Sequence, residues 1–206
     1  MLNALGRNKS MEIVLATRNK QKIEEIRRIL NNINVTTLTL DDLPLCPDVV
    51  EDQDTFEGNA IKKATQIARY TGKIAMADDS GLTVDALGGA PGIRSARYAG
   101  EGATDAENII KLLAELGNLP DEVRGAQFVC CIALAFPRGE VIEFLGSVKG
   151  RISEKPQGRL GFGYDPVFYP SGYDKTFAEM SPQEKDALSH RSKAIKKLKD
   201  YLKDLR

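Results

Sequence analysis

A short apolar strand that leads directly into an amphipathic helix lies near the start of the sequence. Residues 12–16 (EIVLA) form an apolar run typical of a buried strand, and apolar side chains then recur at helical spacing over residues 20–31. After a β-branched segment at residues 35–40, a second helix is predicted from about residue 54 to 68, and it leads into a strand at residues 74–77. This order predicts one mixed α/β domain.

The second half of the sequence predicts a long β-hairpin between helical segments. A glycine-rich loop over residues 78–102 precedes a helix at about residues 104–116. Residues 127–136 and 140–148 flank a Pro-Arg-Gly turn, as expected for a hairpin. Ser181, followed by proline and then by glutamate three residues on, predicts a capped helix near the C-terminus, and a lysine-rich amphipathic helix ends the chain.

The predicted domain spans residues 11–206. Residues 1–10 precede a second methionine, Met11, which opens the first strand, and they are interpreted as an N-terminal extension or an alternative start. Cys46, Cys130 and Cys131 are interpreted as reduced core residues, with the adjacent pair on opposite faces of a strand. With one histidine and no Cys or His cluster, a bound metal is expected to have oxygen ligands.

The charge balance argues against a nucleic-acid-binding protein. The 206 residues carry 29 basic and 29 acidic side chains, so the formal net charge is zero and no overall field attracts a polyanion. No apolar run approaches the roughly 20 residues that a membrane span requires, and the N-terminus lacks the apolar stretch of a signal peptide. We therefore expect a cytoplasmic protein with no nucleic-acid and no membrane partner.

The segment between the first strand and the first helix is suited to binding phosphate. It reads TRNKQK over residues 17–22, and its cations lie where the helix dipole disfavours them by about 0.3 kcal/mol each. An anion would relieve this, and hydroxyl, amide, ammonium and backbone N–H groups together suit a phosphate. The alternative is a solvated basic turn in which Thr17 or Asn19 caps the helix, and both interpretations stay open at this point.

Two consecutive aspartates, Asp78 and Asp79, follow the strand predicted at residues 74–77. Neighbouring side chains on a strand point to opposite faces, so at most one of them points into a given site. Mg²⁺ is commonly held by one or two carboxylates together with substrate phosphates and water, and one of these aspartates plus Glu51 would meet that need. The alternative is a turn in which Asp and Ser80 hydrogen-bond their own backbone.

Two further segments carry candidate binding residues. In GFGYDP, residues 161–166, an aromatic side chain between glycines allows Phe162 to stack on a flat ligand; the alternative is packing in the core. His190 and Arg191 follow Ser189, a good helix N-cap, and cations are disfavoured there unless an acceptor lies opposite. The alternative for this second segment is an exposed joint between two helices.

Seven motifs follow one another along the chain: LATRNKQK (15–22), TFEGNA (55–60), ADDSGL (77–82), LGGAPG (87–92), SARY (95–98), GFGYDP (161–166) and SHR (189–191). In this order they resemble the inosine triphosphate pyrophosphatase family, which hydrolyses non-standard purine nucleotides. The resemblance extends from about residue 11 to the C-terminus. Each motif alone is weak evidence, whereas seven in register are specific.

The resemblance implies an elongated mixed sheet with flanking helices, a central cleft between two lobes, and a homodimer. It implies Mg²⁺, replaceable by Mn²⁺, at Glu51 and Asp79, with Asp79 as the proton acceptor for the attacking water. The acidic loop around Glu51 also offers Asp48, Asp52, Asp54 and Glu57. The implied substrate-binding residues are Thr17, Arg18, Asn19, Lys20, Gln21, Lys22, Ser80, Phe162, Gly163, Tyr164, Asp165, Lys185, His190 and Arg191.

The implied reaction is hydrolysis of ITP, dITP and XTP to the monophosphate and pyrophosphate. Phe162 would stack on the base, while Asp165, Lys185, His190 and Arg191 would contact it. One alternative is an enzyme of the similarly folded Maf pyrophosphatases that acts on pyrimidine or modified nucleotides, which the SHR match disfavours. Another is a nucleotide-binding module without turnover, which the paired aspartates and Glu51 disfavour.

Overall fold

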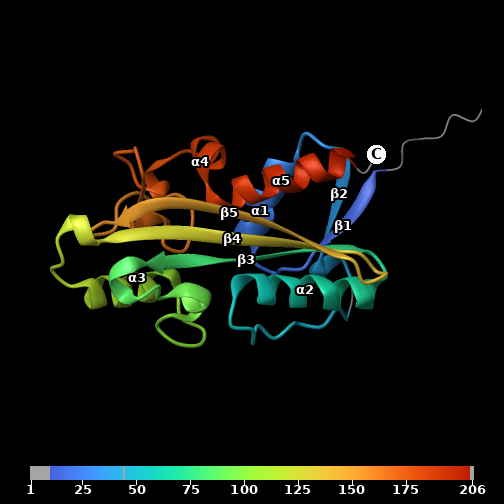
Figure 1. Cartoon of the computed structure of the whole chain (residues 1–206), viewed down its shortest axis with the longest axis horizontal. Coiled ribbons are helices and arrows are strands. Elements are labelled where there is room, and N and C mark those ends of the chain that lie inside the picture. The colour runs from blue at the N-terminus through green and yellow to red at the C-terminus, as the bar shows by residue number, and fades with distance from the viewer. Residues whose placement is uncertain (1–9, 44, 205–206) are drawn as a thin grey trace, which may run out of the picture.

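Six strands form one mixed sheet in the computed structural model, which describes residues 10–43 and 45–204 (Figure 1). The strand order is β2-β1-β3-β4-β5-β6. Strand β1 (Met11–Leu15) is parallel to β2 (Val35–Thr39) and to β3 (Ile74–Val84). Strands β3, β4 (Gly125–Ala135), β5 (Val141–Ile152) and β6 (Phe168–Pro170) are antiparallel neighbours. The predicted α/β fold and the predicted hairpin are confirmed.

Helices cover both faces of this sheet. Helices α1 (Lys20–Leu30) and α5 (His190–Asp204) pack on one face, and α2 (Phe56–Thr71) packs on the other (Figure 1). Helix α3 (Asp105–Leu116) lies toward the opposite end of the long strands, and the short α4 (Pro182–Leu188) precedes α5. Among the described residues, no helix combines the length and apolarity needed to cross a membrane.

The hydrophobic core lies at both ends of the long strands. At one end, Met76 and Cys130 pack with α1 and α5, while Ala77 and Cys131 pack with α2. At the other end, Leu82 and the following part of the sheet pack with α3 and with β6. Strands β3, β4 and β5 run through both ends, and the polar residues of β3 lie between the two apolar regions. The opposite faces expected for Cys130 and Cys131 are confirmed, and both thiols are free.

Strand β3 is longer than the sequence predicts. The pattern predicted a strand that ends at residue 77 and a loop from residue 78, but β3 continues to Val84. Its antiparallel pairing with β4 matches Asp78 to Ile132, Gly81 to Val129 and Val84 to Ala126. A local pattern misses this extension because a partner strand about 50 residues away supplies the hydrogen bonds, and distant cations pair with the two aspartates.

Local capping signals were mostly correct. The side chain of Ser181 accepts from Glu184 N–H in a capping box, and Ser189 Oγ accepts from Ser192 N–H, as predicted. The second helix, predicted to begin at about residue 54, begins at Phe56, because the side chain of Thr55 accepts from Gly58 N–H and caps it. Most of the proposed N-terminal extension lies outside the described residues; Ser10 alone is described, and its hydroxyl lies 2.6 Å from the hydroxyl of Thr36.

Candidate active site

The predicted site residues gather in a cleft where β1 ends and β3 continues. Strand β1 pairs with β3 only as far as Met76, so the edge of β3 beyond that point is open to the loop that follows β1. Two cavities of about 350 Å³ and about 100 Å³ adjoin this edge. Both are lined by Asn19, Lys22, Ser80 and Ala96, so they form one continuous cleft. A ligand can therefore extend along the edge from one cavity to the other.

The larger groove elsewhere on the molecule lacks this chemistry. It measures about 610 Å³ and lies over β5 and α5. None of the predicted catalytic or substrate-binding residues is among the described residues that line it. The cleft beside β3 is therefore the better candidate, although each of its cavities is smaller.

Asp78 and Asp79 point to opposite faces of β3, as the strand geometry predicts. Asp79 lies on the α2 side, where Lys63 approaches it, and lines the larger cavity. Asp78 points toward α1 and α5, where Lys22 and Arg191 pair with it. One aspartate is thus available to a ligand in the larger cavity, while the other is enclosed by cations.

The α2 side of the cleft holds a pair of carboxylates joined by one lysine. Lys63 Nζ lies 2.8 Å from Glu51 Oε1 and 3.4 Å from Asp79 Oδ1, and it also donates to the carbonyl oxygen of Asp78 at 2.9 Å. The other oxygen, Asp79 Oδ2, is buried and has no hydrogen-bond partner among the described residues. Burial raises the pKa of Asp79, and Lys63 and Lys22 only partly offset it. An unpaired buried carboxylate oxygen in a cavity is suited to a cation or a water molecule.

These carboxylates suit a hard cation such as Mg²⁺. Glu51 and Asp79 present oxygens toward one ammonium group, which is the type and number of protein ligands that Mg²⁺ uses beside substrate phosphates. Asp48 and Asp52 are engaged elsewhere, with Arg18 at 2.8 Å and with Lys62 at 2.6 Å. Among the described residues, no group of three or more His, Cys, Asp or Glu side chains is placed to hold a metal ion, so the carboxylates available here are this pair.

The loop after β1 is ordered by its own side chains. Asn19 caps α1, because its Oδ1 accepts from Lys22 N–H at 3.0 Å, and Thr17 Oγ1 accepts from Asn19 N–H at 3.2 Å. Lys22 Nζ lies 2.6 Å from Asp78 Oδ1. Arg18 lines the cavity and forms ion pairs at 2.8 Å with Asp41 and with Asp48.

Two predicted members of this loop point elsewhere. Lys20 and Gln21 are exposed, and neither is among the described residues that line the two cavities. Gln21 instead borders another cavity, of about 160 Å³, beside Glu24. The structure thus brings Thr17, Arg18, Asn19 and Lys22 to the cleft and leaves these two outside.

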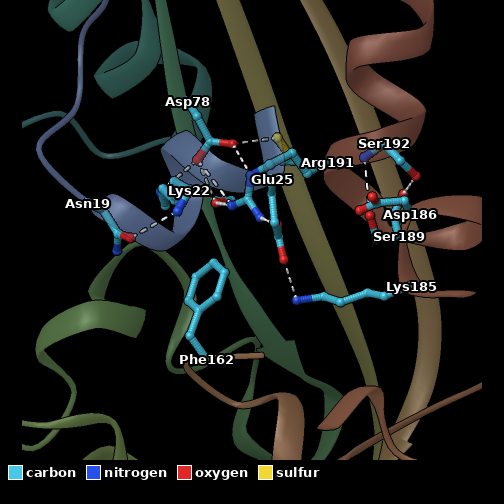
Figure 2. Close-up of polar contacts among 12 residues, drawn as sticks. Asn19, Lys22, Glu25, Asp78, Phe162, Lys185, Asp186, Ser189, Arg191 and Ser192 are labelled. Atoms are coloured by element: carbon cyan, nitrogen blue, oxygen red, sulfur yellow. Dashed lines mark hydrogen bonds and ion pairs between the residues drawn. The ribbon is translucent and has the colours of Figure 1, made fainter. Parts of the chain in front are cut away.

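A buried network of charges connects α1, β3 and α5 (Figure 2). Arg191 is 1% exposed, and it donates from Nε to Asp78 Oδ2 at 2.8 Å, from Nη2 to Ser80 Oγ at 2.8 Å, and from Nη1 to Glu25. Lys185 Nζ donates to Glu25 at 2.7 Å and also to Asp165. These carboxylates are the acceptors that the position of Arg191 at a helix start required.

Pairing with cations keeps Asp78 and Glu25 ionised. Burial alone would raise the pKa of Asp78, but Arg191 and Lys22 outweigh it and hold the pKa well below the usual range. Burial likewise opposes ionisation of Glu25, and Arg191 and Lys185 lower its pKa in net effect. Asp78 and Glu25 therefore stay ionised beside Arg191 and Lys185, both of which line the smaller cavity.

Aromatic and polar groups line the smaller cavity. Lys185 Nζ lies 4.8 Å from the centroid of the Phe162 ring, and Phe162 N–H donates to Asp165 Oδ2 at 2.9 Å. His190 stacks on Phe128 with centroids 4.7 Å apart, and burial together with Arg191 and Lys185 holds its pKa well below the usual range. The buried His190 Nδ1 has no partner among the described residues. A planar ligand with polar edges fits these groups.

Comparison with known proteins defines the family. Residues 13–201 match the Ham1 family. The chain belongs to the Ham1 family. Similar proteins named dITP/XTP pyrophosphatase include one from Geobacter sulfurreducens, 51% identical over 92% of this chain and 96% of that protein. Another, from Clostridium perfringens, is 48% identical over 94% of this chain and 98% of that protein. These names confirm the family predicted from the seven motifs.

Solved Ham1 structures have the same fold. The Ham1 protein of Staphylococcus aureus superposes with a TM-score of 0.85 at 44% identity, covering 95% of this chain and 100% of that chain. A Ham1 protein from Coxiella burnetii superposes with a TM-score of 0.86 at 43% identity, covering 94% of this chain and 99% of that chain. Identity at this level over nearly the whole chain extends the likeness to the sheet and the helices that border the cleft.

Three charged residues that contact predicted site residues were not themselves predicted. Lys63 and Glu25 are both buried, and each lies on the apolar side of its helix, between Ala60 and Ala64 and between Ile23 and Ile26 respectively. A charge on an apolar helical face was a usable signal, because such charges are rarely buried without a partner. Arg97, whose Nη1 lies 3.7 Å from Glu51 Oε2, belongs to the SARY motif and had no assigned role.

Proposed function

We propose that this Ham1 protein hydrolyses ITP, dITP and XTP to the monophosphate and pyrophosphate. The observation that carries the proposal is one cleft that joins the carboxylate pair of Glu51 and Asp79 to an aromatic cavity. Among the described residues, neither the buried Asp79 Oδ2 nor the buried His190 Nδ1 has a hydrogen-bond partner. The first cavity suits phosphates and a cation, and the second suits a base. Relatives that bear the name dITP/XTP pyrophosphatase support the assignment.

We propose Glu51 and Asp79 as the residues that hold Mg²⁺, with Mn²⁺ as a substitute. Bound Mg²⁺ would neutralise phosphate charge and stabilise the charge that develops in the reaction. The ammonium of Lys63 contacts both carboxylates in the described structure, so it would share their charge with the metal ion. This proposal predicts a requirement for metal in catalysis and little effect of metal on the fold of the free protein.

Asp79 is the proposed proton acceptor. Its carboxylate orients a water molecule in line with the α-phosphorus and accepts a proton from that water as the new P–O bond forms. The bond between the α-phosphorus and the bridging oxygen breaks, and pyrophosphate leaves with the electron pair. Thr17, Asn19 and Lys22 bind the phosphates, with Lys22 released from Asp78 or shared with it.

Selection of the base rests on hydrogen-bond donors. Inosine and xanthosine carry a 6-oxo acceptor where adenosine carries a 6-amino donor. Lys185 and Arg191 donate some of their N–H groups to buried carboxylates. Their remaining N–H groups donate to the base. Adenine in this pocket would leave donors facing donors, and sites of this kind reject the wrong partner by about 10⁴-fold. Phe162 stacks on the base, and Asp165 fixes Lys185 and the backbone of Phe162.

Product analysis tests the reaction itself. Incubation of the protein with ITP and Mg²⁺, followed by ³¹P NMR, is expected to yield IMP and pyrophosphate in equal amounts. Formation of IDP and phosphate would contradict attack at the α-phosphorus, and binding without turnover would indicate a nucleotide-binding module. The Maf-like alternative is not favoured, because the chain belongs to the Ham1 family. The homodimer, the cytoplasmic location and the absence of a nucleic-acid partner stay predictions.

A further inference from the structure

The loop that carries Phe162 is attached to the α3 end of the molecule by two hydrogen bonds. Gly163 N–H donates to Asp105 Oδ2 at 2.7 Å, and Tyr164 Oη donates to the carbonyl oxygen of Ser95 at 2.9 Å. The second bond is buried and the first is exposed. Asp105 also lines the smaller cavity beside Phe162, although the sequence motifs assigned it no role.

Asp105 is the first residue of α3, and hydrogen bonds connect this helix to β3 through residues 95–99. Asn108, in the same helix, accepts from Ala99 N–H at 2.8 Å and donates to the carbonyl oxygen of Ala96 at 3.2 Å. The hydroxyl of Ser95 in turn accepts from Leu82 N–H at 2.9 Å. The start of α3, which carries Asp105, is therefore held relative to the strand that carries Asp79 and Ser80.

The orientation of Phe162 depends on the peptide groups that precede and follow it. Gly161 and Gly163 have positive φ values of 74° and 59°, a region that glycine enters at no steric cost and leaves as easily. On one side, Phe162 N–H is fixed by Asp165 at 2.9 Å, and on the other side Gly163 N–H is fixed by Asp105. The hydrogen bond from Gly163 N–H to Asp105 thus restricts backbone rotation at Gly163, the residue directly after Phe162.

We propose that Asp105 is a positioning residue that holds Phe162 in the orientation that stacks on the base. This inference rests on the proposed function, since it concerns the same cleft. When the bond to Gly163 is lost, only part of the population keeps the ring in place, and the apparent affinity for a base falls in proportion to that fraction. The phosphate cavity is lined by other residues, so affinity for phosphates alone is unaffected.

Two variants of Asp105 and one matched control test the proposal. D105A removes the acceptor, whereas D105N keeps an oxygen that can accept from Gly163 N–H. E107A removes a carboxylate from the same helical turn, one that bonds Thr104 N–H at 2.7 Å and does not contact the Phe162 loop in the described structure. Calorimetry measures binding of the α,β-methylene analogue of ITP and, separately, of inorganic tripolyphosphate, both with Mg²⁺.

The expected result is specific to the base. D105A weakens binding of the ITP analogue by about fivefold, which corresponds to about 1 kcal/mol, and leaves tripolyphosphate binding unchanged. D105N recovers most of the loss, and E107A matches the wild type for both ligands. In ¹⁵N-labelled protein, the Gly163 amide resonance shifts in D105A more than in D105N.

Other results would overturn the inference. Wild-type affinity of D105A for the analogue would show that the bond does not position the ring, and equal loss in D105N and D105A would assign the effect to charge. Equal weakening of tripolyphosphate, or the same loss in E107A, would indicate a general change in α3. Failure of the proposed function appears differently, as a wild-type protein that binds the analogue but does not release pyrophosphate from ITP.

Discussion

Replacement of Arg191 by alanine is expected to destabilise the fold as well as to impair base selection. The guanidinium is fully buried and pairs with two buried carboxylates, Asp78 and Glu25. Removal of one partner from a buried ion pair typically costs about 3–5 kcal/mol, because a charge is left uncompensated. Lys22 still pairs with Asp78 and Lys185 with Glu25, so we expect a loss of about 3 kcal/mol, the lower end of that range.

The difference in stability between the wild type and R191A is expected to change with pH in a definite direction. In the wild type, Arg191 helps to hold the pKa of both carboxyl groups below the usual range, so their stabilising contribution is present above about pH 4 and is lost as pH falls through the lowered pKa values. Without Arg191, one cation fewer offsets the burial of these carboxyl groups, so we expect both pKa values to rise. The penalty in the R191A variant therefore decreases as the carboxylates take up protons, and the stability gap narrows from pH 7 to pH 5.

Urea unfolding measures both effects. With an m-value of about 2 kcal/mol per molar urea, the expected loss moves the midpoint of R191A down by about 1.5 M at pH 7. The shift should be smaller at pH 5. A midpoint equal to that of the wild type, or a gap that widens on acidification, would refute the view that Arg191 compensates two buried charges. Base selectivity of R191A is best judged under conditions where the variant is folded.

Three further predictions concern the metal site and the core. D79N should fold normally and lose most turnover of ITP, and wild-type turnover at saturating Mg²⁺ would exclude Asp79 as the proton acceptor. Mg²⁺ binding should weaken as pH falls toward the raised pKa of Asp79, at a higher pH than for an ordinary aspartate, and calorimetry between pH 4 and pH 8 would reveal a flat profile if the reasoning is wrong. Arg124 is buried against the carbonyl oxygens of Ile152 and Ser153, each at 2.9 Å, so R124M should lower the free energy of unfolding by about 2 kcal/mol; an unchanged urea midpoint would contradict this.

Local features of the fold were predictable, because their causes lie within a few residues. Ser181 and Glu184 form the expected capping box, and Asn19 caps α1 as one interpretation of its loop proposed. The alternation of side chains along a strand correctly predicted that Asp78 and Asp79 face opposite ways. In each case the cause is the local backbone geometry or a contact a few residues away.

Features set by distant partners were not predictable from pattern. Strand β3 continues through two aspartates because β4 pairs with it and because Lys63 and Arg191 balance the charges. One partner of Arg191, Glu25, lies 166 residues away, and no local signal connects the two. The sequence did indicate that Arg191 needs an acceptor, because a cation at a helix start is otherwise disfavoured. The identity of this acceptor, Glu25, follows only from the packing of α1 against α5.

The ratio of kcat/KM for ITP to that for ATP, measured by pyrophosphate release with Mg²⁺, tests the central claim most directly. Both nucleotides share the triphosphate, so the ratio reports on the base cavity alone. The donors of Lys185 and Arg191 predict a ratio on the order of 10⁴, with dITP and XTP close to ITP. A ratio near one, or faster hydrolysis of a pyrimidine nucleotide than of ITP, would contradict the account.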